Sequence, residues 1–189
     1  MAAPQQRTAV GGLDRGDPRL DRTLVGGVLF LASELMFFTG LFAAWFMLRA
    51  QTPVWPPAGV EPKPWIALAA TAVLVAAAVP AHLVARGARE RLLLLGAAGA
   101  LVFCALTVWG WARAGLGIGD HAYASLYYAL TGLHLVHVVA GVAVVAAVAV
   151  RASSTGARTS ADVLGVVAWF TWWLAAVAVA VFCLIYLVG

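Results

Sequence analysis

The residue best placed for chemistry in this sequence is a glutamate inside a long apolar stretch. Glu34 stands within the apolar residues 24–48, whereas the other seven of the eight acids lie in loops, tails or helix ends. A carboxylate in hydrocarbon costs several kcal/mol unless it is protonated or paired. We therefore expect Glu34 to be uncharged at pH 7. It serves either a proton relay or substrate site, or a hydrogen bond that fixes helix packing, and the packing role is the commoner one.

Two histidines in a later apolar stretch are the natural partners of that acid. His134 and His137 are three residues apart, so they share one face of a helix. Glu34 lies about 15 Å from the inner end of its helix, at 1.5 Å per residue. His134 lies about 12 Å from the same side of a hydrocarbon core ~30 Å thick. These depths predict a hydrogen bond from Glu34 to His134 or to His137.

The same histidines raise the question of a metal or a haem. An i, i+3 pair forms a metal site only with further ligands from other helices, and only His82 and Glu34 are available within the apolar stretches. A haem between two helices would use His82 with His134 or His137. However, His82 lies near the end of its stretch, where a snorkelling interfacial role is more common. We expect no metal and no haem in this chain.

The composition places all these residues in a membrane. The chain is 63 % hydrophobic and 11 % charged, whereas a soluble domain is roughly a quarter charged. A spanning helix needs about 20 apolar residues. The stretches that qualify are residues 24–48, 65–86, 92–112, 122–150 and 163–188. They do not alternate as barrel strands would. We predict an all-α, five-helix transmembrane bundle over residues 24–189, preceded by a polar cytoplasmic tail over residues 1–23.

The positive charges set the expected orientation. Four Lys or Arg lie in residues 1–23, three in residues 86–91 and two in residues 151–162, which gives nine on one side; the other side has Arg49, Lys63 and Arg113. Basic loops stay in the cytoplasm, so we expect the N-terminus inside and the C-terminus outside. Because the basic residues lie in short loops, the net charge of +4 does not indicate a nucleic-acid partner.

Tryptophans are the remaining candidates for contacts with lipid or with a partner protein. Trp55 lies in a proline-rich loop near the expected outer interface, and Trp172 and Trp173 lie in the last apolar stretch. Aromatic residues concentrate at such interfaces. We consider all three as lipid or partner contacts, although core packing is the commoner explanation for Trp172 and Trp173.

Three motifs together resemble subunit III of the haem–copper cytochrome c oxidases. They are residues 29–44 (LFLASELMFFTGLFAA), residues 55–60 (WPPAGV), and residues 131–137 (TGLHLVH) with Gly141. They occur in the family's order and at about its spacing, so the resemblance covers nearly the whole chain. The length is similar to that of the short bacterial form with five helices.

The resemblance implies an accessory subunit with no redox centre of its own. Subunit III of that family packs on subunit I, which with subunit II carries the haem and copper. It holds phospholipid between its helices and supports proton uptake. The carboxyl matched by Glu34 is known there for reactivity with carbodiimides. The resemblance therefore implies a multi-pass protein of a bacterial cell membrane, in a complex that passes electrons from cytochrome c to oxygen and pumps protons.

The sequence departs from the family pattern in its last helix. The family usually has Tyr-Trp-His-Phe-Val-Asp there, and the His and Asp are replaced by Trp172 and Ala175. The alternatives are a subunit III-like protein of a quinol oxidase, or an accessory protein of a nitric oxide reductase. From other classes, a free-standing b-type membrane cytochrome would use His82 and the later histidines, and a small transporter would use Glu34 as its coupling carboxylate.

Overall fold

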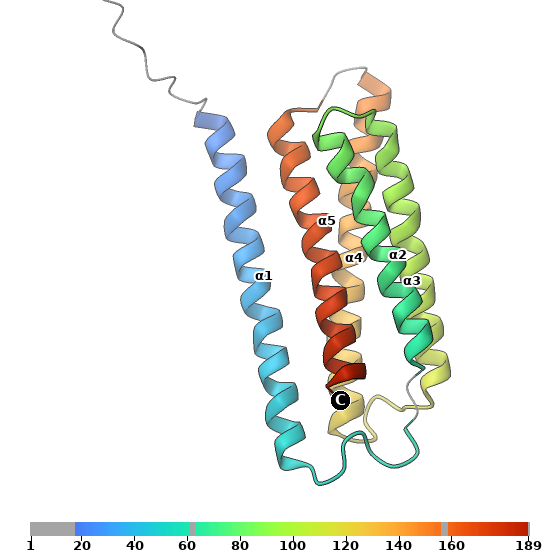
Figure 1. The fold of residues 1–189 in the computed structure, drawn as a ribbon. Helices are drawn as coiled ribbons and strands as arrows, with labels where there is room; N and C mark the ends of the chain where they lie inside the picture. Colours follow the sequence, from blue (N-terminus) through green and yellow to red (C-terminus); the bar gives the residue numbers. More distant parts are fainter. Residues whose placement is uncertain (1–17, 61–62, 156–158, 189) are drawn as a thin grey trace, which may run out of the picture.

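The structure, a computed structural model, is all-helical over the residues that it describes, which are 18–60, 63–155 and 159–188. Its helices are α1 (Pro18–Gln51), α2 (Pro64–Ala85), α3 (Leu93–Ala114), α4 (Ala122–Thr155) and α5 (Ala161–Phe182), with a 3₁₀ turn Glu90–Leu92 before α3 and a π-helical turn Cys183–Leu187 after α5. Within these described residues, five helices are long and apolar enough to cross a membrane. This confirms the predicted all-α bundle of five spans (Figure 1).

The largest difference from the predicted ends concerns the first helix. α1 begins at Pro18, six residues before the predicted span, so residues 18–23, expected in the tail, are helical. Proline is well tolerated in the first turn of a helix because the backbone N–H that it lacks would have no partner there. The rest of the predicted tail, residues 1–17, lies outside the described residues.

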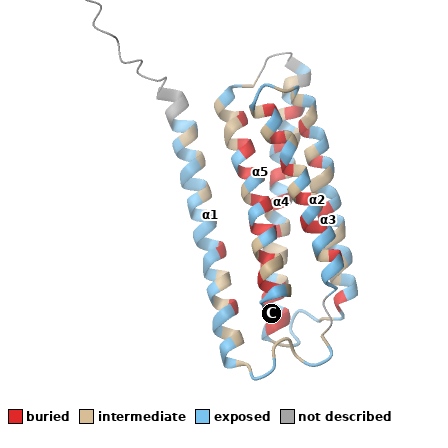
Figure 2. Cartoon of the chain, in the orientation of Figure 1, coloured by how far each residue is buried: buried red, intermediate tan, exposed pale blue. Residues whose placement is uncertain are grey.

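Helix α1 stands apart from the other four. Figure 1 shows α2, α3, α4 and α5 side by side, with α1 along one flank of α4 and α5. Only 6 % of the residues in the most apolar part of α1 are buried, against 28 to 39 % in the other helices. Figure 2 shows the same contrast, with α1 coloured mostly as exposed and only a little of it as buried. Apolar side chains such as Leu29, Met36 and Phe46 therefore face away from the chain.

One face of α1 makes the contacts that hold it. The residues on this face are Gly27 against Val166, Phe30 against Phe170, Glu34 against His137, Phe38 against Trp173, and Trp45 against Tyr123. Their spacing of three, four, four and seven residues is that of a single helical stripe. The opposite face of α1 is exposed and would face lipid or another protein.

A hydrogen-bonded clamp joins the two loops at one end of the bundle. The carboxylate of Glu90, beside α3, accepts from the backbone N–H of Thr159 at 3.0 Å and from its hydroxyl at 2.9 Å. Thr159 lies just before α5, so the α2–α3 turn and the α4–α5 loop are fastened together. Both were expected on the same side of the membrane, and the clamp requires that they are.

Helices α2 and α3 approach closely because α3 carries glycines at their contact. A Cβ added to Gly96 would lie 2.8 Å from the carbonyl oxygen of Ala77, and one added to Gly99 would lie 2.9 Å from the Cβ of Ala77. Small residues at such a contact let two backbones pack closely in a membrane, where van der Waals packing drives helix association.

We therefore expect Gly96→Ala to destabilise the bundle. The new methyl would meet a backbone carbonyl, which cannot move away cheaply, and overpacking typically costs about 1–3 kcal/mol. Gly165→Ala on α5 is the matched control, since a Cβ there meets nothing within 4 Å. Thermal unfolding in detergent, followed by circular dichroism, measures both. Equal midpoints for the two variants would contradict the close packing of α2 on α3.

Candidate functional site

The centre of the candidate site is a contact between a carboxyl on α1 and an imidazole on α4. Oε2 of Glu34 lies 2.7 Å from Nε2 of His137, and Nδ1 of the same ring lies 2.8 Å from the carbonyl oxygen of Leu133. The residues are 103 positions apart in the sequence. The predicted hydrogen bond between Glu34 and α4 is thus confirmed, and it is made to His137. The functional role of the pair stays a prediction.

The geometry fixes how many protons the pair holds. A carbonyl oxygen can only accept, so Nδ1 of His137 must carry a hydrogen and donate it to Leu133. In a neutral imidazole, Nε2 is then an acceptor. The short contact with Glu34 therefore contains one proton, which lies on the carboxyl or on the ring. In both cases the pair as a whole has no net charge, which is the form that hydrocarbon tolerates.

Aromatic rings cover the bundle side of this pair. Phe38, one helical turn after Glu34, lies edge-on to His137 with ring centroids 5.5 Å apart and to Trp173 at the same distance. Trp173 also contacts the His137 ring at 5.8 Å. The side chains of Glu34 and His137 nevertheless keep 20 % and 16 % of their surface exposed. The pair is therefore shielded from the bundle interior and reachable from the flank on which α1 lies.

The second histidine of the predicted pair has a different environment. His134 is only 2 % exposed, and neither of its ring nitrogens has a hydrogen-bond partner within the chain. Its ring lies among the rings of Phe103 at 5.4 Å and Phe38 at 6.2 Å. It points into the space between α2, α3, α4 and α5, not toward Glu34. The i, i+3 spacing thus places one imidazole at the α1 flank and the other inside the bundle.

The three tryptophans proposed as lipid or partner contacts lie in three different environments. Trp55 packs against Trp45 and Tyr123 at the loop end, with ring centroids 5.0 Å from each. Trp172 is 40 % exposed and contacts His82. Trp173 lies beside the carboxyl–imidazole pair. These positions agree with a membrane-facing role for Trp172, whereas Trp173 packs within the chain.

Two buried side chains of α1 were missed by the reasoning from sequence. Phe38 and Trp45 are 1 % and 0 % exposed, and they follow Glu34 by four and eleven residues. Those intervals return to the same helix face, so the spacing held the signal. It went unused because almost every residue of this stretch is apolar, which hides any preferred face.

The histidines offer little room for a metal or a haem. Among the described residues no group of three or more His, Cys, Asp or Glu could hold a metal ion. Both ring nitrogens of His137 already have partners. His134 borders a cavity of about 60 Å³, whereas ligand pockets usually measure about 300–1,000 Å³. A haem on either residue would require the helices to move apart.

These features define a class of protein: a multi-pass helical membrane protein with a neutral carboxyl–imidazole pair at the flank of its bundle. The profile of the family "Cytochrome c oxidase subunit III" matches residues 20–189. The chain belongs to this family, which makes it an accessory subunit of a haem–copper oxidase complex.

Individual relatives agree with the family assignment. The chain is 32 % identical over 145 residues to "Cytochrome c oxidase subunit 3" of Thermostichus vulcanus, which covers 72 % of this chain and 71 % of that one. It is 33 % identical over 179 residues to "Probable cytochrome c oxidase subunit 3" of Mycobacterium bovis, with 87 % of each covered. The match to the protein named "Cytochrome c oxidase subunit 3" in Gallus gallus has 35 % identity over 134 residues and covers half of that protein.

Replacing one partner of the pair tests its energetic coupling. We expect Glu34→Ala and His137→Ala to be non-additive in a double-mutant cycle, with a coupling between about 0.6 and 1.7 kcal/mol, the average and the maximum for hydrogen bonds between membrane helices. Unfolding with sodium dodecyl sulfate in mixed micelles gives the free energies. Glu34→Gln should retain most of the stability because an amide N–H can still donate to Nε2.

A second cycle controls for the general cost of these substitutions. His121 lies at the start of α4, where its Nδ1 accepts from the backbone N–H of Ala124. Glu34→Ala and His121→Ala should be additive, since that ring has a local partner and lies four turns from His137. A coupling as large as that with His137 would mean that the cycle does not measure the direct contact.

Proposed function

We propose that this chain is subunit III of a proton-pumping haem–copper terminal oxidase that transfers electrons from cytochrome c to oxygen. In this proposal α1 docks on subunit I, which with subunit II carries the haem and copper. The observation that favours this is the neutral Glu34–His137 pair on a helix whose remaining surface is apolar and uncovered. A helix with so few partners in its own chain suits a position between two subunits.

The same geometry supports a proton-related role for the pair. One shared proton lies between Glu34 and His137, and both side chains remain partly exposed on the α1 flank. A group that can take or release a proton there would help the catalytic subunit to take protons up. His134 would act structurally, through the bundle interior. Phospholipid would lie against the exposed apolar side chains of α1, and Trp55 and Trp172 would contact lipid or a partner.

The proposed location is the cell membrane of a bacterium, with the N-terminus in the cytoplasm. The asymmetry of basic residues supports this orientation, because the Arg86–Arg91 turn and the end of the α4–α5 loop are clamped together at one end of the bundle.

A second candidate keeps the fold and changes the electron donor. The replacement of the family's His and Asp by Trp172 and Ala175 favours a divergent partner. Both side chains fall on α5, where Trp172 is exposed and Ala175 is 1 % exposed. A quinol oxidase or a nitric oxide reductase is the corresponding alternative complex.

Purification of the tagged chain from its native membrane tests the proposal. We expect a haem–copper subunit to co-purify, and the complex to consume oxygen with reduced cytochrome c as donor. Activity with quinol alone, or reduction of nitric oxide, would favour the second candidate. Recovery of the chain without any haem–copper subunit would contradict both. A haem spectrum in the isolated chain that His134→Ala abolishes would favour a b-type cytochrome.

Carbodiimide labelling tests the state of the carboxyl. A hydrophobic carbodiimide reacts with a protonated carboxyl that it can reach from the lipid, and Glu34 is partly exposed on that side. We expect labelling at Glu34, detected by mass spectrometry, and none in Glu34→Gln. His137→Ala should still be labelled. Labelling confined to acids in the loops would contradict a neutral, accessible Glu34.

A further inference from the structure

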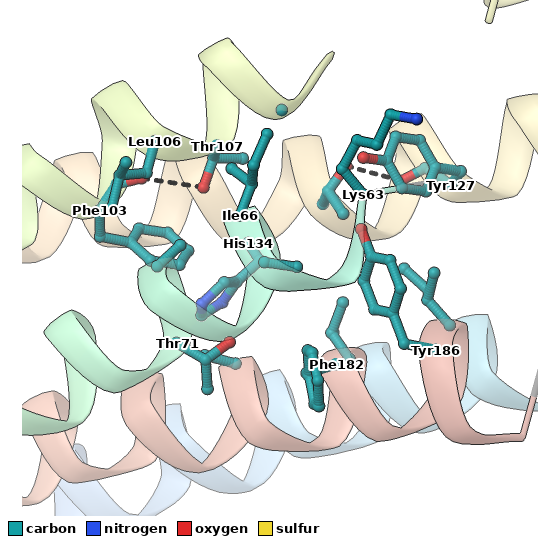
Figure 3. A pocket seen from close by; sticks show the side chains of 17 residues that line it. Lys63, Ile66, Thr71, Phe103, Leu106, Thr107, Tyr127, His134, Phe182 and Tyr186 are labelled. Carbon is teal, nitrogen blue, oxygen red and sulfur yellow. Dashed lines mark hydrogen bonds between the residues drawn. The ribbon is translucent and has the colours of Figure 1, made fainter. Parts of the chain in front are cut away.

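A cavity with several polar side chains in its wall lies between the helices, away from the carboxyl–imidazole pair. It measures about 60 Å³ and is bordered by α2, α3, α4 and the end of α5. Figure 3 shows Lys63, Tyr127 and Tyr186 toward one end and His134, Thr71 and Phe103 toward the other. Lys63 adjoins the start of α2, whereas His134 is twelve residues into α4, about 18 Å along the helix. The cavity therefore leads from the loop end of the bundle toward the middle of the membrane.

His134 is the side chain that makes this cavity unusual. It borders the cavity, it is 2 % exposed, and both of its ring nitrogens lack a partner within the chain. A neutral imidazole has one donor and one acceptor, and buried polar groups in folded proteins almost always find partners. The nearest rings, Phe38 and Phe103, offer no conventional acceptor or donor. The cavity is the space beside His134 that can hold a hydrogen-bonding partner.

Hydroxyl groups on the cavity wall have remaining capacity as acceptors. Thr107 donates to the carbonyl of Phe103 at 2.9 Å, and Thr131 donates to the carbonyl of Tyr127 at 2.6 Å while it accepts from Trp111 at 3.0 Å. Each oxygen is thereby fixed in place with its hydrogen directed at the backbone. A molecule in the cavity can therefore donate a hydrogen bond at least to the hydroxyl oxygen of Thr107.

A second cavity in the same bundle provides the contrast. It measures about 20 Å³ and is bordered almost entirely by Ala, Gly, Val and Leu. Its one hydroxyl, on Thr171, is already bonded to the carbonyl of Ala168. No buried, unpartnered polar atom among the described residues faces it. The unsatisfied imidazole therefore borders the larger cavity, whose wall includes threonine and tyrosine side chains, and not the smaller one.

We propose that the cavity is an internal water-binding site, with His134 as its anchor. A water occupies about 30 Å³ in the liquid, so a cavity of about 60 Å³ has room for about two. One water accepts from the ring N–H of His134 and another donates to its second nitrogen. The volume is too small for a lipid chain, and a single imidazole without further ligands does not hold a metal. This inference does not depend on the proposed function.

Solid-state NMR on the full chain in lipid bilayers tests the site. The chain has four histidines, so ¹⁵N-histidine labelling gives few ring signals, which single substitutions assign. Magnetisation is transferred from water to the ring nitrogens. We expect His134 to gain intensity at mixing times similar to those of His121, which lies at the loop end. No transfer to His134 under conditions in which His121 responds would overturn the proposal.

Filling the cavity provides the matched comparison. Ala178 borders the cavity, whereas Ala176 on the same helix is exposed. We expect Ala178→Leu to reduce the transfer to His134 at least several-fold and Ala176→Leu to leave it unchanged. An unchanged His137 signal shows that each variant is folded. If Ala178→Leu disturbs that signal, Ala67→Leu fills the cavity from α2 instead. Undiminished transfer in a folded filled variant would overturn the proposal.

Xenon separates a wet site from a dry one. Empty apolar cavities bind xenon, whereas hydrated polar ones do not. We expect no xenon-induced shift of the His134 ring signals in the wild-type chain. A xenon-dependent shift there, together with absence of water transfer, would identify a dry void and contradict the site.

Discussion

A buried carboxyl must have a partner, and in this chain that requirement decides where the first helix lies. The contact between Glu34 and His137 is the only carboxyl–imidazole pair between the described parts of α1 and α4. Apart from it, α1 is held by rings and small side chains on one stripe, and few of its residues are buried. Lipid solvates every apolar side of a helix equally well, so burial alone does not determine which face of α1 contacts the bundle. The Glu34–His137 pair determines that face.

The aromatic residues around the Glu34–His137 pair further fix the position of α1 against α4 and α5. Phe38 lies against both histidines and Trp173, so one ring from α1 contacts α4 and α5 at once. Both imidazoles of α4 therefore contact the ring of Phe38. His137 shares a proton with Glu34 at the flank, and His134 faces the interior. A single i, i+3 spacing thus serves two distinct environments.

The sequence was sufficient for the number of spans, their approximate limits and the depth match between Glu34 and α4, because hydrophobic length and rise per residue determine all three. It could not decide whether His134 or His137 bonds to Glu34. Successive residues on a helix point about 100° apart, and the side of α4 that faces α1 depends on how α2, α3 and α5 pack around α4. The sequence also did not show which face of α1 is buried, because Phe38 and Trp45 stand among other large apolar residues. The extension of α1 back to Pro18 was missed since polarity, not helix geometry, set the predicted boundary. The cavity beside His134 depends on the shapes of four packed helices, which no periodicity records.

The order of synthesis adds a consequence to the distance of 103 residues between the two partners. The ribosome adds about 5–20 residues per second, so α1 enters the lipid roughly 5–20 seconds before His137 has been made. During that interval the Glu34 side chain has no imidazole to bond. Until α4 is inserted, the carboxyl must stay protonated or be bound by another protein. Helix α1 therefore reaches its final place only after α4 has been inserted, and nascent chains that stall before α4 would display an unpaired acid to the cell's quality control.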